Sequence, residues 1–258
     1  MMNLKDKIVL ITGASSGIGA ACAEIFAEAG AKLILVARRQ DRLEEIGREL
    51  KEKYSCQSHL IRLDVRDRDQ VAATFASLPP EWCAVDVLIN NAGLSRGLDK
   101  LYQGNIDDWE EMIDTNVKGL LYVTRSLVPG MVARDRGHIV NIGSIAGHQT
   151  YPGGNVYCGS KAAVRSISEG LKQDLLGTAI RVTSIDPGMV ETEFSQVRFH
   201  GDSDRAQQVY QNLTPLTAYD IAEVIFFCVT RPAHVNISEM LLVPTDQATA
   251  TLVHRRTP

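Results

Sequence analysis

Short apolar runs alternate with longer amphipathic segments along almost the whole chain, and this alternation limits the possible folds more than any other feature. The runs are rich in β-branched residues, which is typical of strands buried on both faces. They fall at about residues 8–11, 33–36, 58–63, 85–89, 137–142, 180–185 and 239–243. Helices are expected at about residues 17–29, 41–53, 67–77, 107–134, 157–176 and 218–230. This order predicts an α/β fold, with a doubly wound parallel sheet of about seven strands and helices on both of its faces.

The composition suits a single soluble globular domain over residues 1–258, because no linker, repeat or low-complexity segment divides the chain. The net charge of −4 is too small to favour nucleic acid or a membrane surface as a partner. Five scattered cysteines predict reduced thiols in a cytoplasmic protein, and no signal peptide or long apolar run is found. The six histidines lack metal-ligand spacing, so no metal is expected.

Glycines follow the first predicted strand directly, in the segment Thr12-Gly13-Ala14-Ser15-Ser16-Gly17-Ile18-Gly19. Glycines at a strand-to-helix turn allow a pyrophosphate to approach the free N–H groups at the start of the helix. The spacing Gly-x-x-x-Gly-x-Gly differs from the general Gly-x-Gly-x-x-Gly pattern. Its place after the first strand nevertheless predicts a dinucleotide site of Rossmann type.

The end of the second predicted strand indicates which dinucleotide is bound. An enzyme that prefers NAD carries an acidic residue there, which bonds to the ribose hydroxyl. Here Arg38 and Arg39 occupy the strand end, and a guanidinium suits a phosphate group. We therefore expect NADP(H), although the two arginines could also form a solvated face at the start of the next helix.

Tyr157 and Lys161 are spaced by four residues in the segment where the fifth helix is predicted. This spacing puts both side chains on one face of a helix. A cation beside a phenol favours the phenolate and lowers the pKa from its usual value of about 10, as an acid–base catalyst requires. Taken alone, the pair could also be a packed tyrosine and a solvated lysine.

The chain resembles the short-chain dehydrogenase/reductase family in several motifs that occur in the same order. These are the glycine segment, Asn90-Asn91-Ala92-Gly93 after the fourth strand, Ser144 after the fifth, the Tyr157 and Lys161 pair, and Pro187-Gly188 after the sixth. The resemblance implies a cofactor half to about residue 145 and a catalytic and substrate half from about residue 146.

The resemblance also implies a role for each matching residue. Ser144 would bond to the substrate oxygen, Tyr157 would exchange a proton with it, and Lys161 would hold the nicotinamide ribose. Asn116 would anchor a water in the proton relay. The remaining cofactor residues implied are Gly13, Ser15, Ser16, Gly17, Ile18, Gly19, Asp64, Val65, Asn91, Ala92, Gly93, Pro187, Gly188, Val190 and Thr192, together with Arg38, Arg39, Tyr157 and Lys161.

Four stretches resemble one subgroup, the NADP-dependent dehydrogenases of serine, L-allo-threonine and related 3-hydroxy acids: the loop 151–157, residues 191–201, Tyr210 with Asn212, and residues 232–237. Such a substrate needs a cation or several donors for its carboxylate. Arg198 is the first candidate, with Asn155 and Gln149 as possible partners. Ser144 and Tyr157 would complete the substrate site. Arg198 could instead be a surface charge or an interface residue.

Three functions stay open at this point: the 3-hydroxy acid dehydrogenase, a reductase of another small aldehyde or ketone such as a sulfonated aldehyde, and an NADP sensor without catalysis. Intact Asn116, Ser144, Tyr157 and Lys161 argue against the sensor. Family members commonly form tetramers, so a homotetramer or a homodimer is expected. An apolar face on the long helix would support it, with Leu120, Leu121, Val123 and Leu127.

Overall fold

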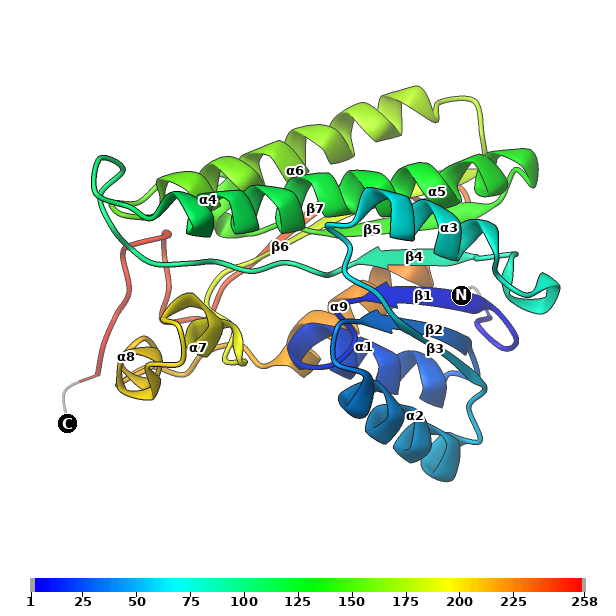
Figure 1. Ribbon diagram of the computed structural model, residues 1–258, viewed down its shortest axis with the longest axis horizontal. Helices are drawn as coiled ribbons and strands as arrows, with labels where there is room; N and C mark the ends of the chain where they lie inside the picture. The colour runs from blue at the N-terminus through cyan, green and yellow to red at the C-terminus, as the bar shows by residue number, and fades with distance from the viewer. Residues whose placement is uncertain (1–2, 257–258) are drawn as a thin grey trace.

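The computed structural model describes residues 3–256, and seven strands in this part of the chain form one parallel sheet. Its order is β3-β2-β1-β4-β5-β6-β7 (Figure 1). The strands are β1 (Ile8–Thr12), β2 (Lys32–Ala37), β3 (Ser58–Arg62), β4 (Val87–Asn90), β5 (Gly137–Ile142), β6 (Ile180–Pro187) and β7 (Glu239–Leu242). The predicted fold class is confirmed.

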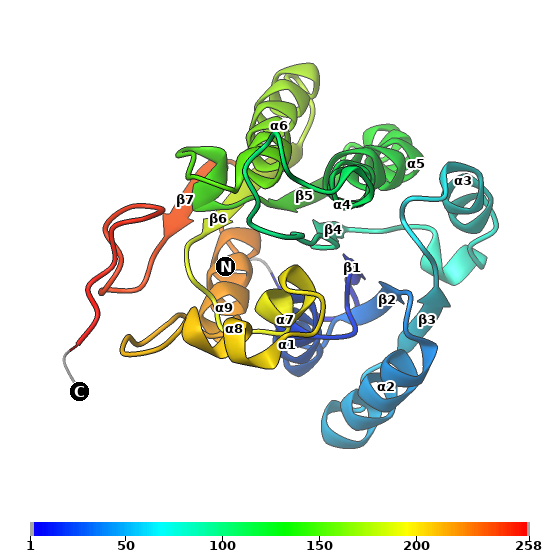
Figure 2. The same ribbon diagram turned by 60° about the vertical axis from the view of Figure 1, so that its left-hand side comes forward.

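Helices cover both faces of the sheet, as Figures 1 and 2 show. One face carries α1 (Gly17–Glu28), α2 (Gln40–Tyr54) and α9 (Ala218–Val229). The other carries α3 (Arg68–Ala76), α4 (Ile106–Ile113), α5 (Leu120–Ala133) and α6 (Asn155–Asp174). Short 3-10 turns lie at Pro80–Trp82 and Ile145–Gly147. The sheet continues across residue 145, so the division into two halves stays a prediction about function.

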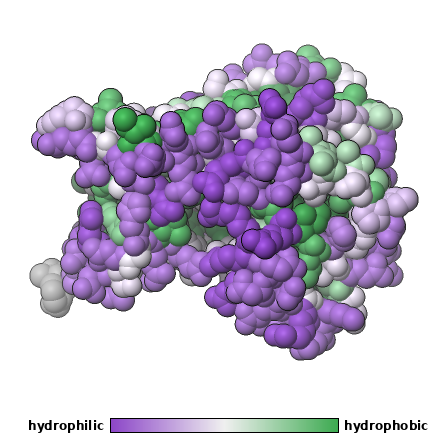
Figure 3. All heavy atoms as spheres, in the orientation of Figure 1, coloured by the Kyte–Doolittle hydropathy of each residue, from purple (hydrophilic) through white to green (hydrophobic). Residues whose placement is uncertain are grey.

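The continuous apolar runs of the sequence follow from this two-sided covering. Successive side chains of a strand point to opposite faces. In β1, Val9 and Ile11 belong to the core under α1 and α9, whereas Ile8 and Leu10 belong to the core under α3 and α5. The outside of the molecule is largely hydrophilic, with smaller apolar areas between the polar ones, on the face that Figure 3 shows.

The expected single helix over residues 107–134 is wrong in detail. A π-helical segment, Asp114–Gly119, separates α4 from α5. Pro129 lies inside α5, which continues to Ala133, so the chain does not end its helix there. Two short helices were also not predicted, α7 (Phe194–Arg198) and α8 (Ser203–Gln208), because they are too short to show a clear apolar period.

The apolar face expected to mediate oligomer formation is mostly part of the chain's own interior. Leu120, Val123 and Leu127 are buried beneath α5, and Leu121 alone of the four predicted residues is exposed. The helix turns three of these side chains toward the sheet, which the sequence could not distinguish from a subunit interface. Within residues 3–256, no helix is both long and apolar enough to cross a membrane.

The sheet order reverses between β1 and β4, which lie side by side although β2 and β3 separate them in the sequence. Loops that leave the carboxyl ends of these strands turn in opposite directions and open a crevice, where ligands bind in sheets of this type. The candidate site lies in this crevice, at the carboxyl ends of the strands.

Candidate active site

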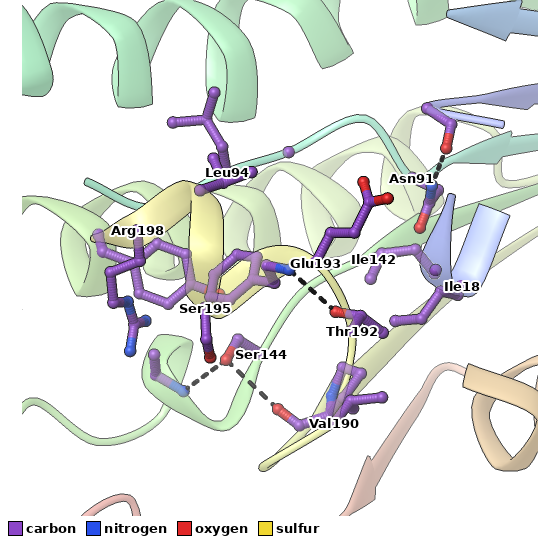
Figure 4. A pocket seen from close by; sticks show the side chains of 18 of the residues that line it. Ile18, Asn91, Leu94, Ile142, Ser144, Val190, Thr192, Glu193, Ser195 and Arg198 are labelled. Atoms are coloured by element: carbon purple, nitrogen blue, oxygen red, sulfur yellow. Dashed lines mark hydrogen bonds between the residues drawn. The ribbon is translucent and has the colours of Figure 1, made fainter. Parts of the chain in front are cut away.

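A cleft of about 670 Å³ lies at the carboxyl ends of the strands. The residues that follow β1, β2, β3, β4, β5 and β6 all contribute to its walls, and the segment 189–198 covers one side. Figure 4 shows this cleft with Ile18 and Asn91 on one wall and Ser144, Val190 and Arg198 on the other. A cleft of this length and position suits an extended ligand such as a dinucleotide.

The glycine segment forms the end of the cleft where α1 begins. Gly13 and the residues Ser15 to Ile18 line the cleft, whereas Gly19 lies buried beneath them. A Cβ atom on Gly19 would stand 2.3 Å from the Gly13 carbonyl oxygen. Asn91 fixes the same turn, because its side-chain nitrogen donates to the carbonyls of Thr12 (2.9 Å) and Gly13 (3.1 Å). The tight turn leaves the start of α1 open to an anion, so these residues fit a pyrophosphate.

Arg38 and Arg39 lie at the end of β2, are exposed and line the same cleft. The Arg39 guanidinium contacts the Ser15 hydroxyl, with Nη2 and Oγ 3.2 Å apart. Arg38 forms a long ion pair with Glu111, at 3.7 Å. Two cations next to the glycine turn fit a phosphate on the adenosine ribose. Asp64 and Val65, which follow β3, line the cleft beside them.

Tyr157, Lys161 and Ser144 meet at the other end of the cleft, and all three are buried. Tyr157 lies in the first turn of α6, and the Lys161 Nζ is 5.9 Å from the centre of its ring. Lys161 donates to the Ile142 carbonyl at 2.8 Å. Ser144 follows β5, and its Oγ accepts from the Ala146 N–H at 3.1 Å (Figure 4). The predicted neighbourhood of these three side chains is present.

Burial has the largest effect on the pKa values of Tyr157 and Lys161. Burial raises the pKa of the Tyr157 phenol, while Arg198 and then Ser144 act in the opposite direction. Burial also lowers the pKa of the Lys161 ammonium to about 8, and the carboxylate of Asp186 opposes that shift. A spacing of four residues on a helix indicates proximity, but it does not show that both groups are removed from water.

Asn116 lies in the π-helical segment and is buried. Its side chain accepts from the Leu94 N–H and donates to the Leu94 carbonyl, both at 2.8 Å, and donates to the Ser160 hydroxyl at 3.0 Å. It is not among the residues that line the cleft. π-helical turns often occur at functional sites. Asn116 thus anchors the loop after β4 to the helix that carries Tyr157 and Lys161.

Arg198 is the last residue of α7, and its side chain extends into the cleft (Figure 4). The centre of its guanidinium is 5.4 Å from the Tyr157 ring centre and 5.0 Å from that of Phe194. Its Nη2 donates to the Tyr151 hydroxyl at 3.2 Å. Its Nε is buried and has no hydrogen-bond partner among residues 3–256. Arg198 therefore holds a buried donor without a partner in this part of the chain, close to Tyr157.

The structure does not bring the other two proposed carboxylate partners into the cleft. Asn155 is exposed and lines a separate small hollow next to Trp109. Gln149 is exposed, and its side-chain oxygen accepts from the Ala250 N–H at 2.9 Å. Tyr151, Phe194, Ser195 and Tyr210 line the cleft instead. Their positions in and after the loop before Tyr157 and the segment after β6 are the signal that could have selected them.

Three groups that could hold a metal ion also lie together, although the sequence spacing gave no sign of them. His148, Asp186 and Glu239 have ligand atoms within 4.8 Å of one another. They are already paired within the chain: His148 contacts the buried Asp186 at 2.8 Å, and Glu239 contacts Arg165 at 2.9 Å. The buried carboxylate of Asp186, in β6, therefore lies next to the end of β5, which Ser144 follows.

The cleft therefore contains most of the residues that the sequence selected. Among the cofactor residues, all except Gly19 line it: Gly13, Ser15, Ser16, Gly17, Ile18, Arg38, Arg39, Asp64, Val65, Asn91, Ala92, Gly93, Tyr157, Lys161, Pro187, Gly188, Val190 and Thr192. Of the proposed substrate residues, Ser144, Tyr157 and Arg198 do so and Asn155 does not.

Residues 7–203 match the model of the short chain dehydrogenase family. The chain belongs to this family. The family that its motifs indicated is thereby confirmed, and the seven-stranded sheet agrees with it.

Similar proteins resemble the chain over nearly its full length. The NADP-dependent 3-hydroxy acid dehydrogenase YdfG of Escherichia coli strain K12 is 49% identical over 251 residues, which cover 96% of this chain and 100% of that protein. The NADP-dependent 3-hydroxy acid dehydrogenase of Schizosaccharomyces pombe is 48% identical, covering 99% of each. A solved structure of the closed form of serine dehydrogenase complexed with NADP⁺ has a TM-score of 0.90 and 49% identity, covering 96% of this chain and 100% of that one.

Proposed function

We propose that the protein is an NADP(H)-dependent oxidoreductase of small 3-hydroxy acids such as serine, L-allo-threonine or 3-hydroxypropionate. The observation that carries the substrate class is the Arg198 guanidinium beside Tyr157, with one buried donor that has no partner within residues 3–256. An acid whose carboxylate bonds to Arg198 would present the hydroxyl on its third carbon to Tyr157. The names of the similar proteins agree with this class of substrate and cofactor.

The residues of the cleft divide the chemistry between them. When bound, NADP(H) accepts or supplies the hydride. Ser144 holds the substrate oxygen, and Tyr157 takes up the hydroxyl proton in oxidation or donates it in reduction. Lys161 presents its ammonium to the nicotinamide ribose and favours the phenolate once Tyr157 has lost its proton. Arg198 and Phe194 exclude water from the Tyr157 ring and fix the position of the acid.

The experiment that tests this function compares oxidation rates for L-serine, L-allo-threonine and 3-hydroxypropionate with NADP⁺. We expect Arg198→Ala to raise the KM for these acids about 10-fold or more, because a charge-assisted hydrogen bond contributes ~1.5–3 kcal/mol. Arg205→Ala is the matched control, since Arg205 packs on Phe199, the residue after α7, and does not line the cleft. An unchanged KM in Arg198→Ala would exclude the proposed role.

A second function is favoured by the same cation, because a guanidinium binds a sulfonate as readily as a carboxylate. Oxidation of NADPH with a panel of small aldehydes, one of them sulfonated, distinguishes it from 3-hydroxy acid dehydrogenation. Turnover of any substrate would exclude a sensor without catalysis. A cytoplasmic location and a homotetramer or homodimer complete the proposal. The exposed Leu121 on α5 is the predicted contact residue that remains available to a partner subunit.

A further inference from the structure

Arg39 lies on the glycine turn at the end of the cleft where the adenosine ribose is expected. Its Nε and Nη2 contact the Ser15 hydroxyl at 3.3 and 3.2 Å, and Nη2 also approaches the Ser15 carbonyl at 3.4 Å. The guanidinium therefore has a fixed position on this wall.

Glu193 reaches this guanidinium from the opposite wall of the cleft. It belongs to the segment between β6 and α7, and its Oε2 is 2.9 Å from the Arg39 Nη2. Figure 4 shows the Glu193 side chain extending from that segment toward the wall with Ile18 and Asn91. The ion pair thus spans the cleft and connects the glycine turn to the segment that precedes Arg198.

The pair is only partly buried, so another anion can reach Arg39 and replace Glu193. The Arg39 and Glu193 side chains are 43% and 38% exposed, and ion pairs with such access to water contribute little to stability. A phosphate dianion binds a guanidinium more strongly than a carboxylate in the same place. Two further cations near the pair favour an anion at this place. Arg38 lies beside Arg39, and Arg42 is close enough for the charge of Glu193 to help raise its pKa.

Glu193 also stands directly before the residues that recognise the substrate. Phe194 follows it, with its ring 5.6 Å from the Tyr157 ring, and Arg198 lies one helical turn further on. The Arg198 backbone is tied to the loop after β4, because its carbonyl accepts from the Gly97 N–H at 2.9 Å. Glu193 therefore belongs to a segment, residues 193–198, that contacts Arg39 at one end of the cleft and Tyr157 at the other.

We propose that Glu193 is a built-in competitor for the 2′-phosphate of the cofactor. Its carboxylate occupies the Arg39 guanidinium in the free protein and leaves it when a 2′-phosphorylated nucleotide binds there. The departure of Glu193 frees the segment that carries Phe194 and Arg198, so the site for the acid becomes adjustable only after the cofactor has bound. This inference rests on the proposed NADP(H) site.

The test uses 2′,5′-ADP and 5′-AMP as probes, because they differ in the 2′-phosphate alone. Calorimetric titration of Glu193→Gln should show 2′,5′-ADP binding about 3- to 10-fold tighter than in the unmodified protein, and 5′-AMP binding changed less than 2-fold. The gain should shrink at 0.5 M salt. Glu191→Gln is the control, since Glu191 is an exposed carboxylate two residues away that does not line the cleft.

A double-mutant cycle with Arg39→Ala separates competition from a general change of charge. If the two carboxylate and phosphate anions share Arg39, Glu193→Gln gives no gain in the Arg39→Ala background. Equal or weaker binding of 2′,5′-ADP by Glu193→Gln, or an equal gain in both backgrounds, would overturn the inference. If instead the unmodified protein binds both probes equally and Arg39→Ala changes neither affinity, the proposed NADP(H) site itself is wrong.

Discussion

Two opposing effects act on the pKa of the Tyr157 phenol. Burial favours the neutral phenol, whereas the cation of Arg198 and the hydroxyl of Ser144 favour the phenolate. Arg198 contacts the face of the same ring, so its charge acts through a region that contains little water. The pKa of the phenol lies above its usual value, because the effect of burial is larger than the two effects that lower it.

The first prediction concerns this phenol. Tyr157→Phe should reduce kcat by ~10²- to 10⁴-fold, because the ring stays in place and the group that exchanges the proton is lost. NADPH affinity, measured by the fluorescence of the nicotinamide, should change less than about 3-fold, since Tyr157 is one of many residues along the cleft. Near-normal turnover in this variant would show that another group carries the proton.

The residues of the site differ in how far the sequence could predict them. Tyr157, Lys161, Ser144 and the glycine turn were found because each lies at a fixed place relative to a strand or helix. Contacts between segments far apart in the chain were not predictable in this way. The Arg39 and Glu193 ion pair depends on how the segment after β6 folds over the cleft, and no periodic pattern records that path. Asn155 was placed wrongly for the same reason, because its side chain lies outside the cleft.

At the level of elements, the strands were predicted more closely than the helices. A strand buried on both faces is largely apolar, so its ends lie close to the ends of an apolar run, as in β1 (Ile8–Thr12) for the predicted run over residues 8–11. The π-helical turn between α4 and α5 has no such mark. Asn116 lies in this turn, and its side chain is held by Leu94 and Ser160.

The ends of β5 and β6 make a second prediction possible. A Cβ atom on Gly143 would lie 1.8 Å from the Asp186 Oδ1, and that carboxylate is held by Ser184 and His148, both at 2.8 Å. Gly143→Ala should therefore reduce the free energy of unfolding by ~1–3 kcal/mol, because a buried group must move. Urea unfolding measures this change, and turnover should fall with it because Ser144 is the next residue.

Gly170→Ala in α6 is the matched control for that substitution. Within residues 3–256 and apart from the backbone of α6 itself, no heavy atom lies within 4 Å of a Cβ atom at Gly170, and alanine is favoured over glycine inside a helix. We expect this variant to be more stable by ~0.5–1 kcal/mol. Equal effects of the two substitutions would mean that the close contact with Asp186 has no energetic consequence.

For the molecule as a whole, a row of buried polar side chains crosses the middle of the sheet. Asn90 donates to Asn141 at 2.9 Å, and Asn141 donates to Ser168 of α6 at 2.8 Å. One strand further, the His138 Nε2 lies 2.8 Å from the Thr183 hydroxyl. Buried polar groups of this kind are tolerated when they are bonded to each other, so this row links the central strands to α6.

His138 makes the stability of the whole molecule depend on pH. Burial, aided by the charge of Arg181, lowers its pKa from 6.5 to about 3. The unfolded chain therefore binds a proton near pH 6.5 that the folded chain does not bind until about pH 3, so stability is full above pH 6.5 and falls toward pH 3. Between pH 7.5 and pH 5 this residue alone should reduce the free energy of unfolding by ~2 kcal/mol.

We expect His138→Gln to remove that part of the pH dependence in urea unfolding, whatever its effect at neutral pH. His234→Gln, at an exposed position, should leave the dependence as it is. An unchanged slope in His138→Gln would mean that His138 accepts its proton in the folded sheet as readily as in water.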